Sequence, residues 1–258
     1  MKFIDFCMTF YYLLAQKFLL TLFRSFYGLK PQGVRGKNWD GGLIIASNHQ
    51  SFIDPIVIGS AAPRELYYFA KEEIFSWPVI GFLARSFNAF PVKREAFDLE
   101  AIRAANRVLR SGKALVVFIE GTRSRTGELL PPKNGVGLLA YQNRVDVLPA
   151  YVHGTFRLRR SLLHYPGLIV AFGERMRIAD YEHLGLPKKD LYNRIAQDAM
   201  AQIRRLKADV LRRFHTFGYS ASQEAKNRKG GNIEHGTRGE KSNRSGSGGE
   251  TGVEPARR

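Results

Sequence analysis

The feature that most constrains the fold is a series of six short apolar runs, which alternate from residue 42 onward with segments of helical periodicity. Several of these runs are apolar throughout, as is typical of strands that are covered on both faces of a sheet. We therefore predict an α/β fold, in which a single domain has a mostly parallel central sheet flanked by helices. The predicted strands are residues 43–47, 66–70, 88–92, 114–119, 146–152 and 168–172.

Two segments carry their apolar residues at helical spacing. The first is Asp98–Arg110, whose apolar stripe leaves three arginines on its other faces. In the second, apolar residues recur at helical spacing from Leu191 to Phe214. In open sheets that alternate with helices, functional sites form in the loops at the carboxyl ends of the strands. Polar clusters in those loops are therefore the candidates for a site.

The N-terminal segment, residues 1–28, is dense in aromatic and aliphatic residues but is interrupted by Asp5, Lys17 and Arg24. Its longest uncharged run, Phe6–Gln16, is shorter than the about 20 apolar residues that a membrane-spanning helix needs. We predict an amphipathic helix in the membrane interface, with the two cations reaching toward water. This implies a peripheral or monotopic protein on the cytoplasmic face of a membrane. The alternative is a helix that packs on the core.

The sequence predicts two further parts after this helix. Residues 29–217 form the folded domain, and residues 218–258 are rich in Gly, Ser, Asn and charge without any apolar period. Such a composition predicts a disordered basic tail. The single cysteine, Cys7, excludes an intramolecular disulfide, which fits a reducing compartment.

The chain is strongly basic, since its 40 Lys and Arg residues against 23 Asp and Glu residues give a net charge of +17. A basic folded body attracts phosphate groups. These belong to nucleic acid, to anionic lipid headgroups or to a phosphorylated substrate, and the charge alone does not distinguish the three.

The stretch "ASNHQSFIDP", residues 46–55, follows the first predicted strand and contains both His49 and Asp54. On one α-helix these two side chains would lie about 140° apart, so they meet only across a turn. Pro55 favours a helix that begins there, which would make Asp54 its N-cap. The capping role explains Asp54 but not His49. A His–carboxylate pair at a strand end is instead the common arrangement of a general base, and both interpretations stay open.

Two other strand ends carry polar residues. "FIEGTRS", residues 118–124, places a turn and an arginine after a strand, where backbone N–H groups and a guanidinium form an anion site. "NAFPVKR", residues 88–94, ends another strand with two adjacent cations. Taken singly, these are a plain turn and a solvated basic pair. Together with the histidine they predict one polar site at this edge of the sheet.

These stretches resemble, in order and spacing, the motifs of the glycerolipid acyltransferases, the family of 1-acylglycerol-3-phosphate acyltransferases. The resemblance covers roughly residues 35 to 175 and includes the segment 69–81 and the Lys-x-Gly segment at 133–140. The four motifs are "NHQSFID" at 48–54, "FPVKR" at 90–94, "EGTRS" at 120–124 and "VLPA" at 147–150.

The resemblance implies that His49 is the general base and that Asp54 orients it. His49 takes the proton of a free hydroxyl on a lysophospholipid, which then attacks the carbonyl of a fatty acyl thioester. With 1-acylglycerol-3-phosphate as acceptor, the product is phosphatidic acid. The residues of the "EGTRS" turn bind the headgroup, and three cations outside it add charge for the phosphate or stabilise the oxyanion. The implied substrate-binding residues are Lys71, Lys93, Arg94, Glu120, Gly121, Thr122 and Arg123.

The same resemblance implies direct transfer, with no metal, no acyl-enzyme and no cofactor. The co-substrate is an acyl thioester of coenzyme A or of acyl carrier protein, and the other implied partner is an anionic membrane surface rather than nucleic acid. One departure is Ile119, which stands where the third motif usually has proline. The N-terminal segment is also too short for several membrane spans, so we expect monotopic attachment.

Two alternatives differ from this interpretation. Within the class, the acceptor is another lysolipid, such as a lyso-ornithine lipid or a lysophospholipid with a larger headgroup. Outside it, the chain is a non-catalytic basic protein that binds nucleic acid or a membrane. The second alternative predicts salt-sensitive nucleic-acid binding and gives His49 no role.

Overall fold

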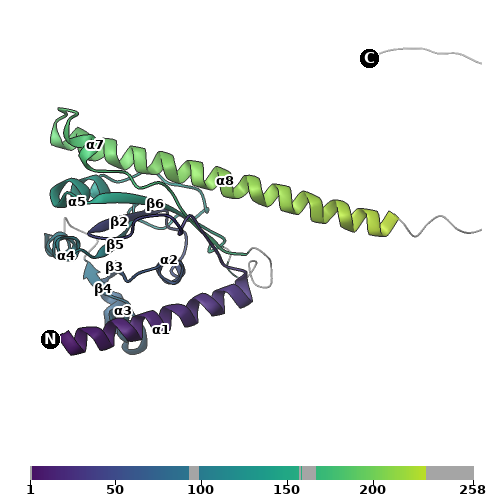
Figure 1. The fold of residues 1–258 in the computed structure, drawn as a ribbon, viewed down its shortest axis with the longest axis horizontal. Coiled ribbons are helices and arrows are strands. Elements are labelled where there is room, and N and C mark those ends of the chain that lie inside the picture. The colour runs from purple at the N-terminus through teal and green to yellow at the C-terminus, as the bar shows by residue number, and fades with distance from the viewer. Residues whose placement is uncertain (1, 93–98, 157, 159–166, 231–258) are drawn as a thin grey trace, which may run out of the picture. The chain divides into compact units, whose positions relative to one another are not determined.

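A computed structural model describes residues 2–92, 99–156, 158 and 167–230 of the chain (Figure 1). Seven strands form one sheet in the order β1-β7-β6-β2-β5-β3-β4. All neighbouring strands pair in parallel except β6 and β7, which are antiparallel. The strands are β1 (Lys30–Gln32), β2 (Leu43–Ser47), β3 (Leu66–Lys71), β4 (Ala89–Val92), β5 (Ala114–Phe118), β6 (Asp146–His153) and β7 (Ile169–Phe172).

This architecture confirms the predicted α/β fold with a mostly parallel sheet. The six predicted strands correspond to β2 through β7, with ends that differ by about one residue. Strand β1 was not predicted; it is three residues long and contains Pro31. Proline cannot donate to a strand ladder and is confined to positions such as an edge strand, which β1 is.

Helices cover both faces of the sheet. Because alternate residues of a strand point to opposite faces, Leu43 and Ile45 of β2 pack with α1 and α2, whereas Ile44 and Ala46 pack with α4, α5 and α8. The helices are α1 (Lys2–Tyr27), α2 (Asp54–Ala61), α3 (Pro78–Ser86), α4 (Leu99–Arg110), α5 (Gly135–Asn143), α7 (Ala179–Glu182) and α8 (Lys188–Gly230), with a 3₁₀ helix, η1, at Glu72–Ser76.

Helix α1 confirms the expected N-terminal helix. One side of it is buried at Tyr12, Gln16 and Phe23. The side-chain amide of Gln16 donates to the carbonyls of Gly59 and Ala62 at 2.6 and 2.9 Å, and so satisfies groups at the C-terminal end of α2. Within the described ranges, no helix has the length and apolarity that crossing a bilayer requires.

The C-terminal helix α8 continues to Gly230 and therefore runs past residue 217, where the sequence places the end of the domain. The chain divides into two compact units at this helix, residues 1–214 and residues 215–258. The remainder of the expected tail, from residue 231, lies outside the described residues.

Candidate active site

The loop after β2 is held to the neighbouring strand β6 by one side chain. The amide of Asn48 donates to the carbonyl of Val152 at 3.1 Å and accepts from its backbone N–H at 2.8 Å. Asn48 is fully buried, so this pair of bonds replaces the ladder where β2 ends. Asn48 is not among the site residues predicted from the sequence. An amide that offers one donor and one acceptor beside the histidine is the signal that would have found it.

The same loop brings His49 and Asp54 together. Nδ1 of His49 lies 2.8 Å from Oδ2 of Asp54, and both side chains are buried. The same oxygen accepts the backbone N–H groups of Gln50 and Ser51 at 2.6 and 2.7 Å. An oxygen that already accepts two bonds acts as an acceptor toward the ring, so Nδ1 carries the proton. This leaves the lone pair of His49 on Nε2.

The prediction that Asp54 is the N-cap of the following helix is wrong. Ile53 occupies the cap position with helical backbone angles, no side chain caps α2, and Asp54 is its first residue. The carboxylate instead turns back to the N–H groups of Gln50 and Ser51, which precede the helix. The carboxylate binds these N–H groups rather than those of the first turn of α2, because the loop folds over it. Capping therefore does not explain Asp54, whose Oδ2 binds the loop and the imidazole.

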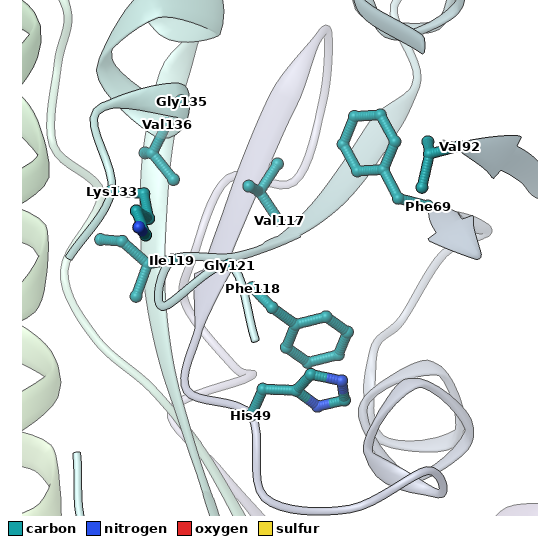
Figure 2. Close-up of a pocket in the computed structure, with 10 residues that line it drawn as sticks. All are labelled: His49, Phe69, Val92, Val117, Phe118, Ile119, Gly121, Lys133, Gly135 and Val136. Carbon is teal, nitrogen blue, oxygen red and sulfur yellow. The ribbon is translucent and has the colours of Figure 1, made fainter. Parts of the chain in front are cut away.

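The imidazole of His49 is also held by an aromatic ring. It stacks on Phe118, the last residue of β5, with ring centroids 3.8 Å apart and planes inclined by 15° (Figure 2). Asp54 fixes one edge of the imidazole and Phe118 fixes its plane. Nε2 has no hydrogen-bonding partner in the part of the chain that the structure describes. In the neutral imidazole, this geometry presents the lone pair of Nε2 with little rotational freedom.

Beside the imidazole lies a cavity of about 230 Å³. Its walls are mostly apolar and come from β3, β4, β5 and the start of α5 (Figure 2). Lys133 brings the one ammonium group to the lining. Lys133 belongs to the Lys-x-Gly segment of the resemblance but is not among the predicted site residues. The lining residues are His49, Phe69, Val92, Val117, Phe118, Ile119, Gly121, Lys133, Gly135 and Val136.

The turn after β5 is joined to the histidine loop. The backbone N–H of Ser124 donates to the carbonyl of His49 at 2.8 Å. Gly121 has a φ of +68°, and a side chain there would press on that of Lys133, so this position favours glycine. The guanidinium of Arg123 lies 3.5 Å from the ring centroid of Phe52, which is 67% exposed. This turn therefore places a cation beside the loop that carries His49.

Glu120 differs from its neighbours in the turn, because it is only 2% exposed. Neither carboxylate oxygen makes a hydrogen bond of good geometry among the described residues, although backbone N–H groups of Leu130 and His49 lie close enough to lower its pKa. Burial outweighs them and raises the pKa of Glu120 to about 7. Its place under the turn suits a residue that acts on the loop better than one that touches a headgroup.

The other predicted site residues fall into three groups. Gly121 and Thr122 are exposed in the turn with Arg123. Lys71 ends β3 at the same edge of the sheet, half-buried, with its ammonium 3.9 Å from a carboxylate oxygen of Glu73. Lys93 and Arg94 lie outside the described residues. The structure thus brings the histidine loop and the turn after β5 together, and places Lys71 at the same sheet edge.

Comparison with known proteins agrees with this fold. A family model described as Acyltransferase matches residues 29–153. A 1-acyl-sn-glycerol-3-phosphate acyltransferase of Bacillus subtilis is 31% identical over 63% of this chain and 80% of its own length. One from Streptococcus pneumoniae is 28% identical over 57% of this chain and 54% of its own, and a human one, of the beta type, is 29% identical over 52% and 50%.

Among solved structures, a 1-acyl-sn-glycerophosphate acyltransferase from Thermotoga maritima, PlsC, superposes with a TM-score of 0.57 at 24% identity. It covers 80% of this chain and 88% of its own, and it shows the likeness of the fold. Together with the sequence matches it defines the class as an enzyme that transfers acyl groups. The chain belongs to the acyltransferase family. The resemblance is thus confirmed, and the alternative of a non-catalytic basic protein is wrong.

Proposed function

We propose that this enzyme transfers a fatty acyl group from a thioester to the free hydroxyl of 1-acylglycerol-3-phosphate, and so forms phosphatidic acid. The observation that carries the proposal is the His49–Asp54 pair, which opens onto an apolar cavity and lies beside the guanidinium of Arg123. The names of the relatives give the acceptor, and the site offers a base, an apolar surface and a cation for it.

In the proposed reaction, Nε2 of His49 takes the proton of the acceptor hydroxyl as its oxygen attacks the thioester carbonyl. The oxygen–carbon bond forms and a tetrahedral oxyanion appears. When the oxyanion collapses, the carbon–sulfur bond breaks and the leaving thiolate takes the proton from the imidazolium. Asp54 holds the tautomer and stabilises the imidazolium charge in between. The atoms balance without a covalent enzyme intermediate.

The substrates differ in which part of the site suits them. An acyl chain suits the apolar cavity, because it removes apolar surface from water. The phosphate suits Arg123 and the exposed backbone of Gly121 and Thr122, with Lys71, Lys93 and Arg94 as further cations. Lys133 lines the cavity and is placed to meet a developing oxyanion or the phosphate of a thioester carrier. Coenzyme A and acyl carrier protein both remain candidate donors.

We also propose that the enzyme works on the cytoplasmic face of a membrane without spanning it. The support is α1, which buries one side on the domain and leaves Phe10, Leu14 and Phe18 exposed on the other. Lys17 and Arg24, also exposed, suit anionic headgroups.

The test is an acceptor screen with one labelled acyl thioester. We expect labelled phosphatidic acid from lysophosphatidic acid, and a loss of at least about 10³-fold in His49→Ala, because the proposed reaction depends on the imidazole as its base. Circular dichroism of the variant checks that it folds. If the variant kept its full rate, the mechanism would fail. Equal rates with acceptors that lack phosphate would support the alternative lysolipid, for which the mechanism stays and the role of Arg123 changes.

A further inference from the structure

Exposed large apolar side chains gather on a few elements. Most of those in the described part of the chain belong to α1, to the start of α2, or to α3 and the residue before it. On α1 they recur about every fourth residue, on the side opposite the buried Tyr12 and Gln16. The segment around α3 exposes Trp77, Val79, Ile80, Phe82 and Leu83.

Packing against the rest of the domain does not explain the apolar side chains of α3. The one buried residue within it is Gly81, whereas Val79 is 71% exposed and Phe82 is 63% exposed. A short helix that turns almost all of its large apolar side chains to solvent is a mark of an interaction site. Phe87, the residue that follows α3, contacts α1, because its ring meets that of Tyr12 edge to face with centroids 5.8 Å apart.

The charges of these two segments indicate the partner. Residues 10–27 and 77–87 contain three exposed cations, Lys17, Arg24 and Arg85, and no acidic residue. Apolar side chains with interspersed cations and a tryptophan match the interface of an anionic bilayer. A second copy of the chain fits less well, because a two-fold contact would set this cationic surface against itself.

We propose that residues 77–83 form a second membrane-inserting element, which docks with α1 onto an anionic lipid bilayer. This rests on the proposed function in one respect: the bilayer then holds the lysolipid acceptor. The segment follows β3, which ends at the same edge of the sheet as the loop of His49. Phe52, exposed beside Arg123, lies in that loop. Docking through α3 thus brings the site to its substrate.

Two tryptophans make the docking measurable. Trp39 is 8% exposed and its indole N–H donates to the carbonyl of Val34, whereas Trp77 is 62% exposed. On addition of vesicles that contain phosphatidylglycerol, we expect the emission of Trp77 to shift to the blue and to be quenched by lipids brominated on their acyl chains. Trp77→Phe should lose both signals while Trp39 remains. Unquenched Trp77 in protein that sediments with the vesicles would overturn the proposal.

A paired substitution tests the energetics. Val79→Ser with Phe82→Ser should weaken partition onto anionic vesicles roughly tenfold to a hundredfold, since two large apolar groups no longer enter the lipid. The matched control is Leu184→Ser with Leu186→Ser, which are exposed elsewhere and should change nothing. If the α3 variant bound vesicles with wild-type affinity, the proposal would be wrong. It would also be wrong if the free protein sedimented as a dimer in which Trp77 is inaccessible to solvent.

Activity separates this proposal from the proposed function. The α3 variant should keep its rate with a short-chain, water-soluble lysophosphatidic acid and lose rate with a long-chain acceptor embedded in vesicles. If the wild-type enzyme acylated neither acceptor, the proposed function would fail, while vesicle binding would still decide the role of α3. Equal loss with both acceptors would mean that α3 supports the fold or the site rather than docking.

Discussion

Two buried carboxylates flank the same histidine and are treated differently by the fold. Oδ2 of Asp54, in the loop after β2, accepts from His49 and from two backbone N–H groups. Glu120, in the turn after β5, is buried without a well-formed hydrogen bond among the described residues, and burial raises its pKa to about 7. Oδ2 of Asp54 accepts well-formed hydrogen bonds before any substrate arrives, whereas Glu120 is buried with only poorly aligned backbone donors nearby.

This difference gives the two carboxylates near His49 different roles. Donors fix the carboxylate of Asp54 in one position, so it transmits that position to the imidazole. A carboxyl group without donors holds its proton to higher pH, since a bare charge in low dielectric is costly. We therefore assign Asp54 to orientation of the base and Glu120 to the support of the turn, with a protonation state that depends on pH near neutrality.

The largest effect should come from Asp54→Asn. The amide is close in shape to the carboxylate but lacks the charge that stabilises the imidazolium, and its NH₂ group favours the wrong tautomer of His49. We expect kcat to fall about 10³- to 10⁴-fold. The measurement is acyl transfer at saturating acceptor, with the melting temperature as the control for folding. A fall below tenfold in a well-folded variant would contradict the role given to Asp54.

Phe118→Leu should have the next largest effect. It removes the ring on which the imidazole stacks but leaves Asp54 in place, and so asks whether one hydrogen bond is enough to hold His49. We expect a loss of roughly tenfold to a hundredfold in kcat, because a base with more rotational freedom spends less time in line with the hydroxyl. Val117→Ala, also on the cavity wall, is the control for a change of cavity shape alone.

Glu120→Gln should change the pH dependence of stability. An unfolded glutamate loses its proton near its ordinary pKa of 4.5, and the folded one near 7. Between these values the folded state holds more protons, so Glu120 makes the free energy of unfolding fall as pH rises, and this fall ends above about pH 7. The variant should lack this contribution. Urea unfolding of both proteins at pH 5, 6, 7 and 8 measures the difference, and parallel curves would show that Glu120 does not titrate in this range.

Most of the sheet could be predicted because an apolar run of strand length is recognisable from its own residues alone. The prediction missed β1, which is defined by pairing of Lys30 with Ile169 across the chain rather than by its own composition. At the site, spacing and resemblance predicted His49 and Asp54. The bond of Asn48 to Val152 is a contact between residues 104 apart, and a sequence reveals no such distance.

The wrong capping role of Asp54 and the unexpected burial of Glu120, which was predicted among the headgroup-binding residues, have local causes. A capping rule considers the residues after an aspartate, whereas the donors that bind Asp54 come before it. Glu120 precedes Gly121 and Thr122, which are exposed, yet its own side chain is only 2% exposed. In both cases the sequence pattern does not specify the direction of the side chain, because tertiary packing determines it.

The smallest expected effect concerns the charge of Lys207 and its influence on the pKa of Glu120. The ammonium of Lys207, on α8, lowers the pKa of Glu120, so Lys207→Met should raise that pKa and extend the fall in stability to slightly higher pH. Lys207 also lowers the pKa of His153 and pairs with Glu128, so the single variant mixes three effects. Lys207→Met in the Glu120→Gln background isolates the effect on Glu120. Without the carboxyl group, the extension of the fall in stability to higher pH must vanish. A shift that persists without Glu120 would assign the effect to His153 or Glu128 and would show that Lys207 does not act on Glu120.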